Sequence, residues 1–220
     1  MRIFLFSLLV FIAFQSCQNN LDRKLPIFGE KEVVEHMVDG KMKVDTIYQT
    51  IPSFSFINQD GGQITDKDFN HTIYIADFFF TSCSTICPMM DQNMLLLYKE
   101  YKGNSRVKFL SHTIDPRHDT PAVLKQYAHS LGVDGSQWQF VCGSQDAIYQ
   151  IAKSYLVAAY DDQSDPQGRV HQGWFVLIDP DKRIRGAYDG TNKEEVMKLK
   201  RDVKKLLAEY DGSSRKKNIL

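Results

Sequence analysis

A continuous apolar run that leads into a two-cysteine turn constrains the fold of this chain more than any other feature. The segment 73–80 is apolar at every position except Asp77, which is typical of a strand covered by helices on both faces. Cys83 and Cys87 follow in a short turn, and the segment 89–101 has the pattern of a helix. The sequence therefore predicts a buried strand, a tight turn that carries two thiols, and a helix.

The two thiols are expected where the helix begins. If the helix starts near Cys83 or Ser84, Cys83 and Cys87 are at positions i and i+4 and share one face. The N–H groups and partial positive charge of a helix N-terminus lower the pKa of a thiol and favour the thiolate. Thiolate is both the nucleophile of disulfide exchange and a soft metal ligand. The turn is predicted to hold a metal or to transfer electrons; the plainer alternative is a structural disulfide or two buried thiols.

The N-terminal segment 1–17 resembles a bacterial lipoprotein signal peptide. Arg2 precedes an apolar run at 3–14 that is short for a membrane span, and Ser16 is the small residue before Cys17. The resemblance implies that Cys17 is lipidated and anchors the chain to a membrane. An ordinary signal peptide cut nearby, or an uncleaved anchor, is the alternative. All three place the domain outside the cytoplasm, on the periplasmic side, where disulfides can persist.

Composition limits both the partners and the cysteine pairing. The formal net charge is zero, so there is no electrostatic argument for nucleic-acid binding. With Cys17 assigned to lipid, Cys83, Cys87 and Cys142 remain, and an odd number cannot form a fully paired disulfide framework. Cys142 is predicted to be a small buried residue at the end of a strand.

The remaining chain predicts one α/β domain at 51–210. A polar tether at 18–50, which includes a short extended arm at 44–49, precedes this domain, and a polar, frayed tail at 211–220 follows it. Strands are expected at 51–57 and 63–65 (a hairpin), 72–80, 106–114, 138–141, 174–178 and 183–188, and helices at 89–101, 121–131, 145–155 and 191–210. This order, with a dithiol after the first central strand, is typical of a thioredoxin-like fold, a central mixed sheet flanked by helices, with an N-terminal β-hairpin extension.

Four motifs together resemble the Sco (SenC) family of thioredoxin-like copper-binding proteins, which serve cytochrome c oxidase assembly. The segment 80–90 resembles the family's FTxCxxxCPxM, and 113–127 resembles its VDPxxDTPxxLxxY. The segment 138–143 resembles WxFLTG, and 171–179 resembles HxxxxxLID. CxxxCP alone is moderately specific, whereas its combination with DPxxDTP and the distant histidine is highly specific. The resemblance covers about 52–210.

The resemblance implies one copper ion, as Cu(I) or Cu(II), bound by Cys83, Cys87 and His171. Soft thiolates select Cu(I), and a Cys₂His set also accommodates Cu(II). A structural zinc site would lack its fourth ligand here. Spacing alone cannot place His171 beside the thiols, since a lone histidine at the start of a strand is more often an ordinary hydrogen-bonded residue.

Two functions follow from these expectations. The first is a metallochaperone, not an enzyme, that delivers copper to the cytochrome c oxidase subunit with the binuclear copper centre. The second is a thiol-disulfide oxidoreductase, in which Cys83 reacts and Cys87 resolves, and which reduces cysteines of that subunit or of other extracytoplasmic proteins. Another copper chaperone or a thioredoxin-like reductant would be a further partner. The CxxxC spacing and His171 favour the metallochaperone, and the cysteine pair argues against a peroxidase with one reactive cysteine.

The other candidate residues receive structural roles. His112 and His118 are predicted to be solvent-exposed at a strand end and in a loop, although either could support a metal ligand. Asp119 is expected to act as a charge at a helix start. Met89 and Met90 are expected to fill the core or an interface rather than to bind copper.

Overall fold

A seven-stranded mixed sheet forms the centre of the computed structural model, which describes residues 24–133, 135–162 and 169–217. The strand order is β11-β10-β5-β6-β7-β3-β4. The central strands β5, β6 and β7 are parallel, and β10, β11, β3 and β4 add to the edges in antiparallel fashion. The strands are β3 (Ser55–Asn58), β4 (Gln63–Thr65), β5 (Ile73–Phe79), β6 (Val107–Thr113), β7 (Trp138–Cys142), β10 (Trp174–Ile178) and β11 (Ile184–Asp189). The predicted thioredoxin-like α/β fold is confirmed.

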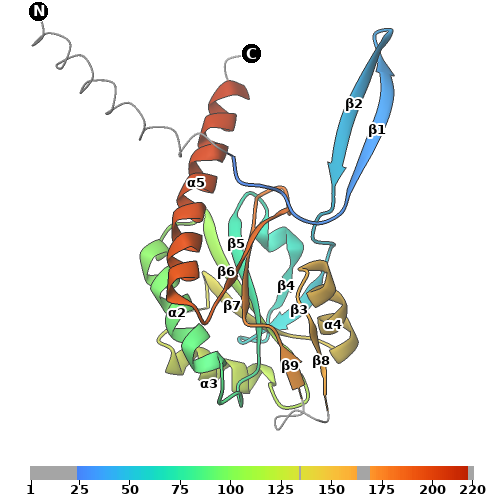
Figure 1. The fold of residues 1–220 in the computed structure, drawn as a ribbon. Helices are drawn as coiled ribbons and strands as arrows, with labels where there is room; N and C mark the ends of the chain where they lie inside the picture. The colour runs from blue at the N-terminus through green and yellow to red at the C-terminus, as the bar shows by residue number, and fades with distance from the viewer. Residues whose placement is uncertain (1–23, 134, 163–168, 218–220) are drawn as a thin grey trace, which may run out of the picture.

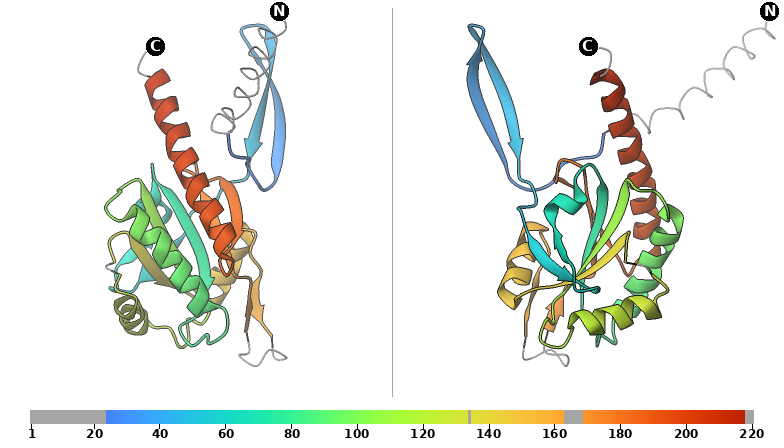
Figure 2. Two further views of the ribbon diagram at one scale, coloured as in Figure 1. Left: turned by 60° about the vertical axis from the view of Figure 1, so that its left-hand side comes forward. Right: turned by 180° about the vertical axis from the view of Figure 1, so that it is seen from behind.

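Helices cover both faces of this sheet. Figures 1 and 2 show α2 and α5 side by side on one face and α4 on the other. Every residue of β5 is buried, as its apolar run predicts. The helices are α2 (Cys87–Tyr101), α3 (Pro121–Ser130), α4 (Gln145–Ser154) and α5 (Lys193–Lys217), and a 3₁₀ turn, η1, covers Asp66–Phe69.

Side-chain caps fix where the helices begin. The hydroxyl of Thr120 accepts a hydrogen bond from the N–H of Val123 at 3.4 Å, and that of Ser144 accepts one from Ala147 at 3.3 Å. Serine and threonine satisfy a free N–H at a helix start, so these two residues set where α3 and α4 begin. Asn192 caps α5 by accepting from the N–H of Glu194 at 2.9 Å.

Part of the segment that was predicted to be a polar tether forms a projecting β-hairpin. Within 18–50, β1 (Lys31–Val38) pairs with β2 (Lys41–Tyr48) in antiparallel register. Asp39 and Gly40 join them with φ of 52° and 73°, the positive values of a type I′ turn. The hairpin extends away from the domain (Figure 1), and the hairpin predicted at 51–65 is a separate one, formed by β3 and β4 at the sheet edge.

Three further elements differ from the predicted boundaries. Helix α2 begins at Cys87, not near Cys83, and α5 continues to Lys217 instead of ending at 210. A short pair, β8 (Ala159–Asp161) and β9 (Arg169–His171), precedes β10.

The signal segment 1–17, with Cys17, lies outside the described residues. No helix in the described part of the chain has the length and apolar character to cross a membrane.

Candidate metal centre

Both thiols of the motif lie at the end of β5, in and just after the turn that leads into α2. The N–H of Cys83 donates to the carbonyl of Phe80 at 3.1 Å, which closes the turn. Cys87 is the first residue of α2, and Pro88 occupies its first turn, where proline suits the helix because its missing N–H would have no helical partner. Only 8% of Cys83 and 2% of Cys87 is exposed, so the site is nearly closed to solvent.

The thiol of Cys87 is held in its protonated form. A hydrogen bond with the Cys83 side chain is the main cause that raises the pKa of Cys87, and burial raises it further. This corrects the expectation of a lowered pKa at the helix N-terminus, since the Cys83 side chain and burial both favour the neutral thiol. A metal that binds both sulfurs would have to displace this proton.

The backbone that carries His171 lies close to this turn. His171 pairs with Ala159 at the end of β9, and Gly173 follows two residues later. A Cβ atom placed on Gly173 would lie 3.4 Å from the Cδ1 of Ile86 and 3.4 Å from the Sδ of Met90. The segment after His171 therefore packs against the start of α2, an arrangement that spacing in the sequence could not show.

The side chain of His171 lies outside the described residues, so its role as a ligand stays a prediction. Among the described side chains, no group of three or more His, Cys, Asp or Glu residues is arranged to hold a metal ion. Cys83 and Cys87 are therefore the two described side chains of the expected ligand set. Cys142, predicted to be a small buried residue at the end of a strand, does lie at the end of β7 but is only half-buried.

Asp119 ties the loop after β6 to the cysteine turn. Its Oδ2 accepts hydrogen bonds from the N–H of Thr81 at 3.0 Å and from the hydroxyl of Thr113 at 2.5 Å. Its Oδ1 accepts one from the hydroxyl of Thr81 at 2.5 Å and contacts Nδ1 of His118 at 2.9 Å. Asp119 is fully buried, and Thr81 is two residues before Cys83. Sequence reasoning missed this contact because the partners are 38 positions apart.

Two carboxyl groups on the elements that flank the cysteine turn have raised pKa values: Asp77 is buried on β5, and Asp91 is half-buried on α2. Burial raises the pKa of Asp77 to about 7, and the hydroxyl of Ser111 donates to its Oδ1 at 2.5 Å. Burial also raises the pKa of Asp91 to about 6, where the hydroxyl of Tyr127 donates to its Oδ2. Both carboxyls can therefore take up or release a proton near neutral pH.

His112 is a core residue, which corrects the expectation that it is exposed. Its side chain is fully buried, and its ring stacks on Phe78 with centroids 4.8 Å apart. Burial lowers the pKa of His112 to about 4, so the folded protein holds it neutral. The free energy of unfolding therefore decreases as the pH falls from 6.5 towards 4, because over this range the unfolded chain binds a proton at His112 more readily than the folded protein does. His118, by contrast, is exposed as predicted, with 58% of its side chain accessible.

Asp77→Asn is expected to stabilise the protein at alkaline pH. The folded-state pKa of about 7 lies above the ordinary aspartate value of 3.8, so the native carboxyl costs free energy once the pH exceeds that ordinary value, and the cost is complete above pH 7. We expect a gain of up to about 4 kcal/mol at pH 8 and almost none near pH 4. Urea unfolding across this range would measure it, and a gain independent of pH would contradict it.

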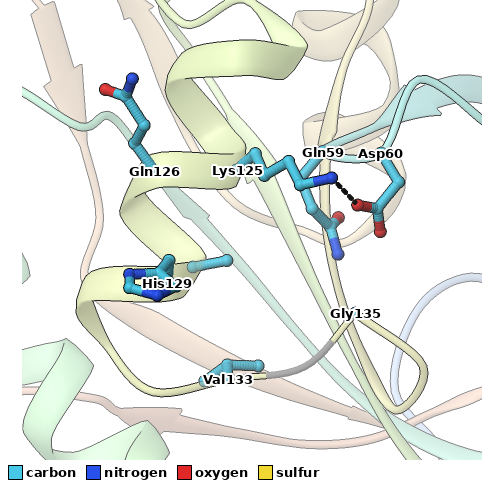
Figure 3. A pocket seen from close by; sticks show the side chains of 8 residues that line it. Gln59, Asp60, Lys125, Gln126, His129, Val133 and Gly135 are labelled. Carbon is cyan, nitrogen blue, oxygen red and sulfur yellow. Dashed lines mark ion pairs between the residues drawn. The ribbon is translucent and has the colours of Figure 1, made fainter.

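A separate pocket of about 450 Å³ lies between α3 and the turn that joins β3 to β4 (Figure 3). An ion pair of 3.1 Å between Lys125 and Asp60 crosses its mouth. The lining residues are Gln59, Asp60, Lys125, Gln126, Ala128, His129, Val133 and Gly135. Neither cysteine of the motif lines it, so this pocket is not the candidate metal centre.

A sequence model of the SCO1/SenC family matches residues 43–208. A SCO1 protein homolog of Bacillus subtilis is 32% identical over 168 residues, which cover 75% of this chain and 86% of that protein. The match includes all of β3 to β11 and most of α5, so it covers the whole sheet and both cysteines.

Solved structures agree with this match. A SCO1/SenC family lipoprotein from Bacillus anthracis is 31% identical, with a TM-score of 0.66, over 72% of this chain and 95% of that one. BsSco is described as a member of the Sco family of cytochrome c oxidase assembly proteins with a disulfide switch. It is 29% identical, with a TM-score of 0.60, over 70% of this chain and 92% of that one. Yeast Sco1 with copper bound is 26% identical, with a TM-score of 0.55, over 71% of this chain and 89% of that one.

Proposed function

The chain belongs to the SCO1/SenC family, and from this premise we propose that it is a copper metallochaperone. In this proposal Cys83, Cys87 and His171 bind one copper ion, as Cu(I) or Cu(II). The protein then delivers the ion to the cytochrome c oxidase subunit that carries the binuclear copper centre. Copper is the cargo, and no covalent reaction is catalysed.

One observation carries the proposal. Two hydrogen-bonded thiols lie in a nearly dry turn, and the backbone that follows His171 packs against the helix that begins at Cys87. Thiolate and imidazole ligands suit copper, and a set of three leaves the ion accessible to a partner's ligands. Yeast Sco1, a relative with the same fold, has been solved with copper bound.

A thiol-disulfide oxidoreductase is the second candidate, and the contact between the two sulfurs favours it. The Cys83 side chain is the main cause of the raised pKa of Cys87, which supports two thiols close enough to interact. Loss of two electrons and two protons to a disulfide substrate would join them as a disulfide. BsSco is described as containing a disulfide switch. Its substrates here would be cysteines of the oxidase subunit or of other extracytoplasmic proteins.

The proposal includes a lipid anchor at Cys17 that holds the domain on the periplasmic side of a membrane. The Bacillus anthracis relative is described as a lipoprotein. Mass spectrometry of the membrane-extracted chain would show a mature N-terminus at Cys17 with its acyl groups. A free N-terminus elsewhere would contradict the anchor without affecting the copper site.

Copper stoichiometry of the chain from Lys24 onward tests the metallochaperone proposal. Reduced, anaerobic wild-type protein is expected to bind one copper at the two thiols of the cysteine turn, and His171→Ala to bind that ion at least about tenfold more weakly, since one of three ligands is lost. His129→Ala, an exposed histidine on α3, is the matched control and should bind as wild type does. No stable copper in the wild type, with dithiol reductase activity intact in His171→Ala, would favour the oxidoreductase.

A further inference from the structure

Two methionines lie opposite each other at the tip of the projecting hairpin. In the register of β1 and β2, Met37 pairs directly with Met42, one step before the Val38–Lys41 pair that closes the turn. The pair that closes a two-residue turn, here Val38–Lys41, is a hydrogen-bonded pair. Hydrogen-bonded and non-hydrogen-bonded pairs alternate along an antiparallel ladder, so Met37–Met42 is a non-hydrogen-bonded pair. Side chains of such a pair point to the same face and approach closely, with Cβ atoms about 4.5–5.5 Å apart. Both thioethers can therefore reach one ion between them.

Neither methionine is used for packing. Met37 is 63% exposed and Met42 is 62% exposed, although methionine is among the residue types most often buried. On the same face Val33 and Val44 are each 58% exposed. The type I′ turn at 39–40 fixes the register, so the paired position of the sulfurs is set by the backbone and not by contacts with the domain.

We propose that Met37 and Met42 form a binding site for a soft monovalent metal ion, Cu(I), at the tip of the hairpin. Thioether sulfur is a neutral, soft ligand that selects Cu(I) over harder ions such as Zn(II). It needs no deprotonation, so binding would not compete with protons. Glu35 occupies the next position on this face, opposite Val44, and its carboxylate can balance the positive charge.

The other charged groups near the tip face away from this pair. His36, Lys41 and Lys43 lie on the opposite face of the hairpin, because they alternate with the methionines along the strands. His36 is engaged with Asp45, with Nε2 and Oδ2 3.4 Å apart. The hairpin also projects from the end of the domain opposite the cysteine turn (Figure 1). The site thus shares no ligand with Cys83 and Cys87, and its test is independent of the proposed function.

Silver(I), a soft monovalent probe for Cu(I), tests the site on the full chain in detergent, with all four cysteines replaced by serine. The chain has seven methionines, and methyl-labelled methionine gives one NMR signal for each. We expect the signals of Met37 and Met42 to move together on addition of Ag(I), and those of the buried Met90 and Met94 to stay. Zn(II) should move none of them.

The variant Met37→Leu/Met42→Leu keeps the size and apolar character of both side chains, and it should lose at least about tenfold in Ag(I) affinity. The matched control is Met89→Leu/Met197→Leu, because these methionines are also exposed, at 48% and 40%, but are not cross-strand partners. The control should bind as the parent does. Equal affinity in the two double variants, or shifts spread over all exposed methionines, would overturn the proposal.

Discussion

Asp179→Ala is expected to lower the free energy of unfolding by about 3 kcal/mol, because it breaks a buried ion pair on one side only. Asp179 is fully buried at the end of β10. Its Oδ2 accepts from Nη1 of Arg185 at 3.0 Å and from Nε of Arg183 at 2.9 Å. Only 1% of the Arg185 side chain is exposed. Glu209 still pairs with Arg185 at 2.8 Å, which keeps the loss at the low end of the range for such pairs.

Chemical denaturation of wild type and variants would measure this effect. Asp179→Ala/Arg185→Met is the matched control, since removing both charges should recover a large part of the loss. Arg183→Ala should cost much less than Asp179→Ala, because a quarter of the Arg183 side chain is exposed and exposed pairs contribute little. A loss below about 1 kcal/mol for Asp179→Ala would mean that water compensates the buried guanidinium.

Asp119→Ala is expected to weaken both the fold and the copper site. The substitution leaves the N–H of Thr81 and the hydroxyl of Thr113 without their acceptor, at a cost of about 2–4 kcal/mol in unfolding free energy. It also releases the segment just before Cys83 from the loop after β6. We expect copper affinity to fall at least about tenfold, measured by competition with a chromophoric Cu(I) chelator under anaerobic conditions.

Two control variants separate the effect of Asp119 on the position of the cysteine turn from its effect on the stability of the fold. Thr113→Val removes a donor to Asp119 that lies on β6 and not on the cysteine turn, and it leaves both hydrogen bonds from Thr81 in place, so it should reduce stability while copper affinity stays near that of wild type. Asp119→Asn keeps the shape and one acceptor oxygen, so it should recover part of the copper affinity. If Asp119→Ala unfolds more easily yet binds copper as wild type does, Asp119 supports the fold alone.

The central sheet could be predicted because its signals are local. The uninterrupted apolar runs at 73–80 and 174–178 identify buried strands, and Thr120 and Ser144 mark helix starts by their own capping chemistry. A start near Cys83 placed the beginning of α2 too early and the helical pattern at 89–101 placed it two residues too late, whereas Pro88 in the first turn indicates a helix that begins at Cys87. The hairpin β1–β2 had a signal in Asp39-Gly40, but its strands are solvent-exposed on both faces and lack a clear apolar period.

The candidate site could be predicted only in part, because its contacts join distant segments. CxxxC placed both thiols in one turn, but the raised pKa of Cys87 depends on the Cys83 side chain and on burial, which only the fold sets. The position of Gly173 against Met90 and the contacts of Asp119 with Thr81 depend on strand order. His112 was placed in solvent because a histidine at a strand end is polar, whereas the aromatic rings around it bury it.

The pairing of β10 with β5 also has a consequence for the order of events during synthesis of the chain. Val176 pairs with Ala76, one hundred positions earlier. Contacts over so long a separation form late, because a large loop must close first. In the proposed export of this chain, Cys83 and Cys87 therefore leave the translocation machinery well before the strand that completes the sheet beside them. A nascent chain would pass through an interval in which its thiols are open to oxidants but the backbone around His171 is not yet in place. Reductant supplied during that interval would determine how many molecules can capture copper at all.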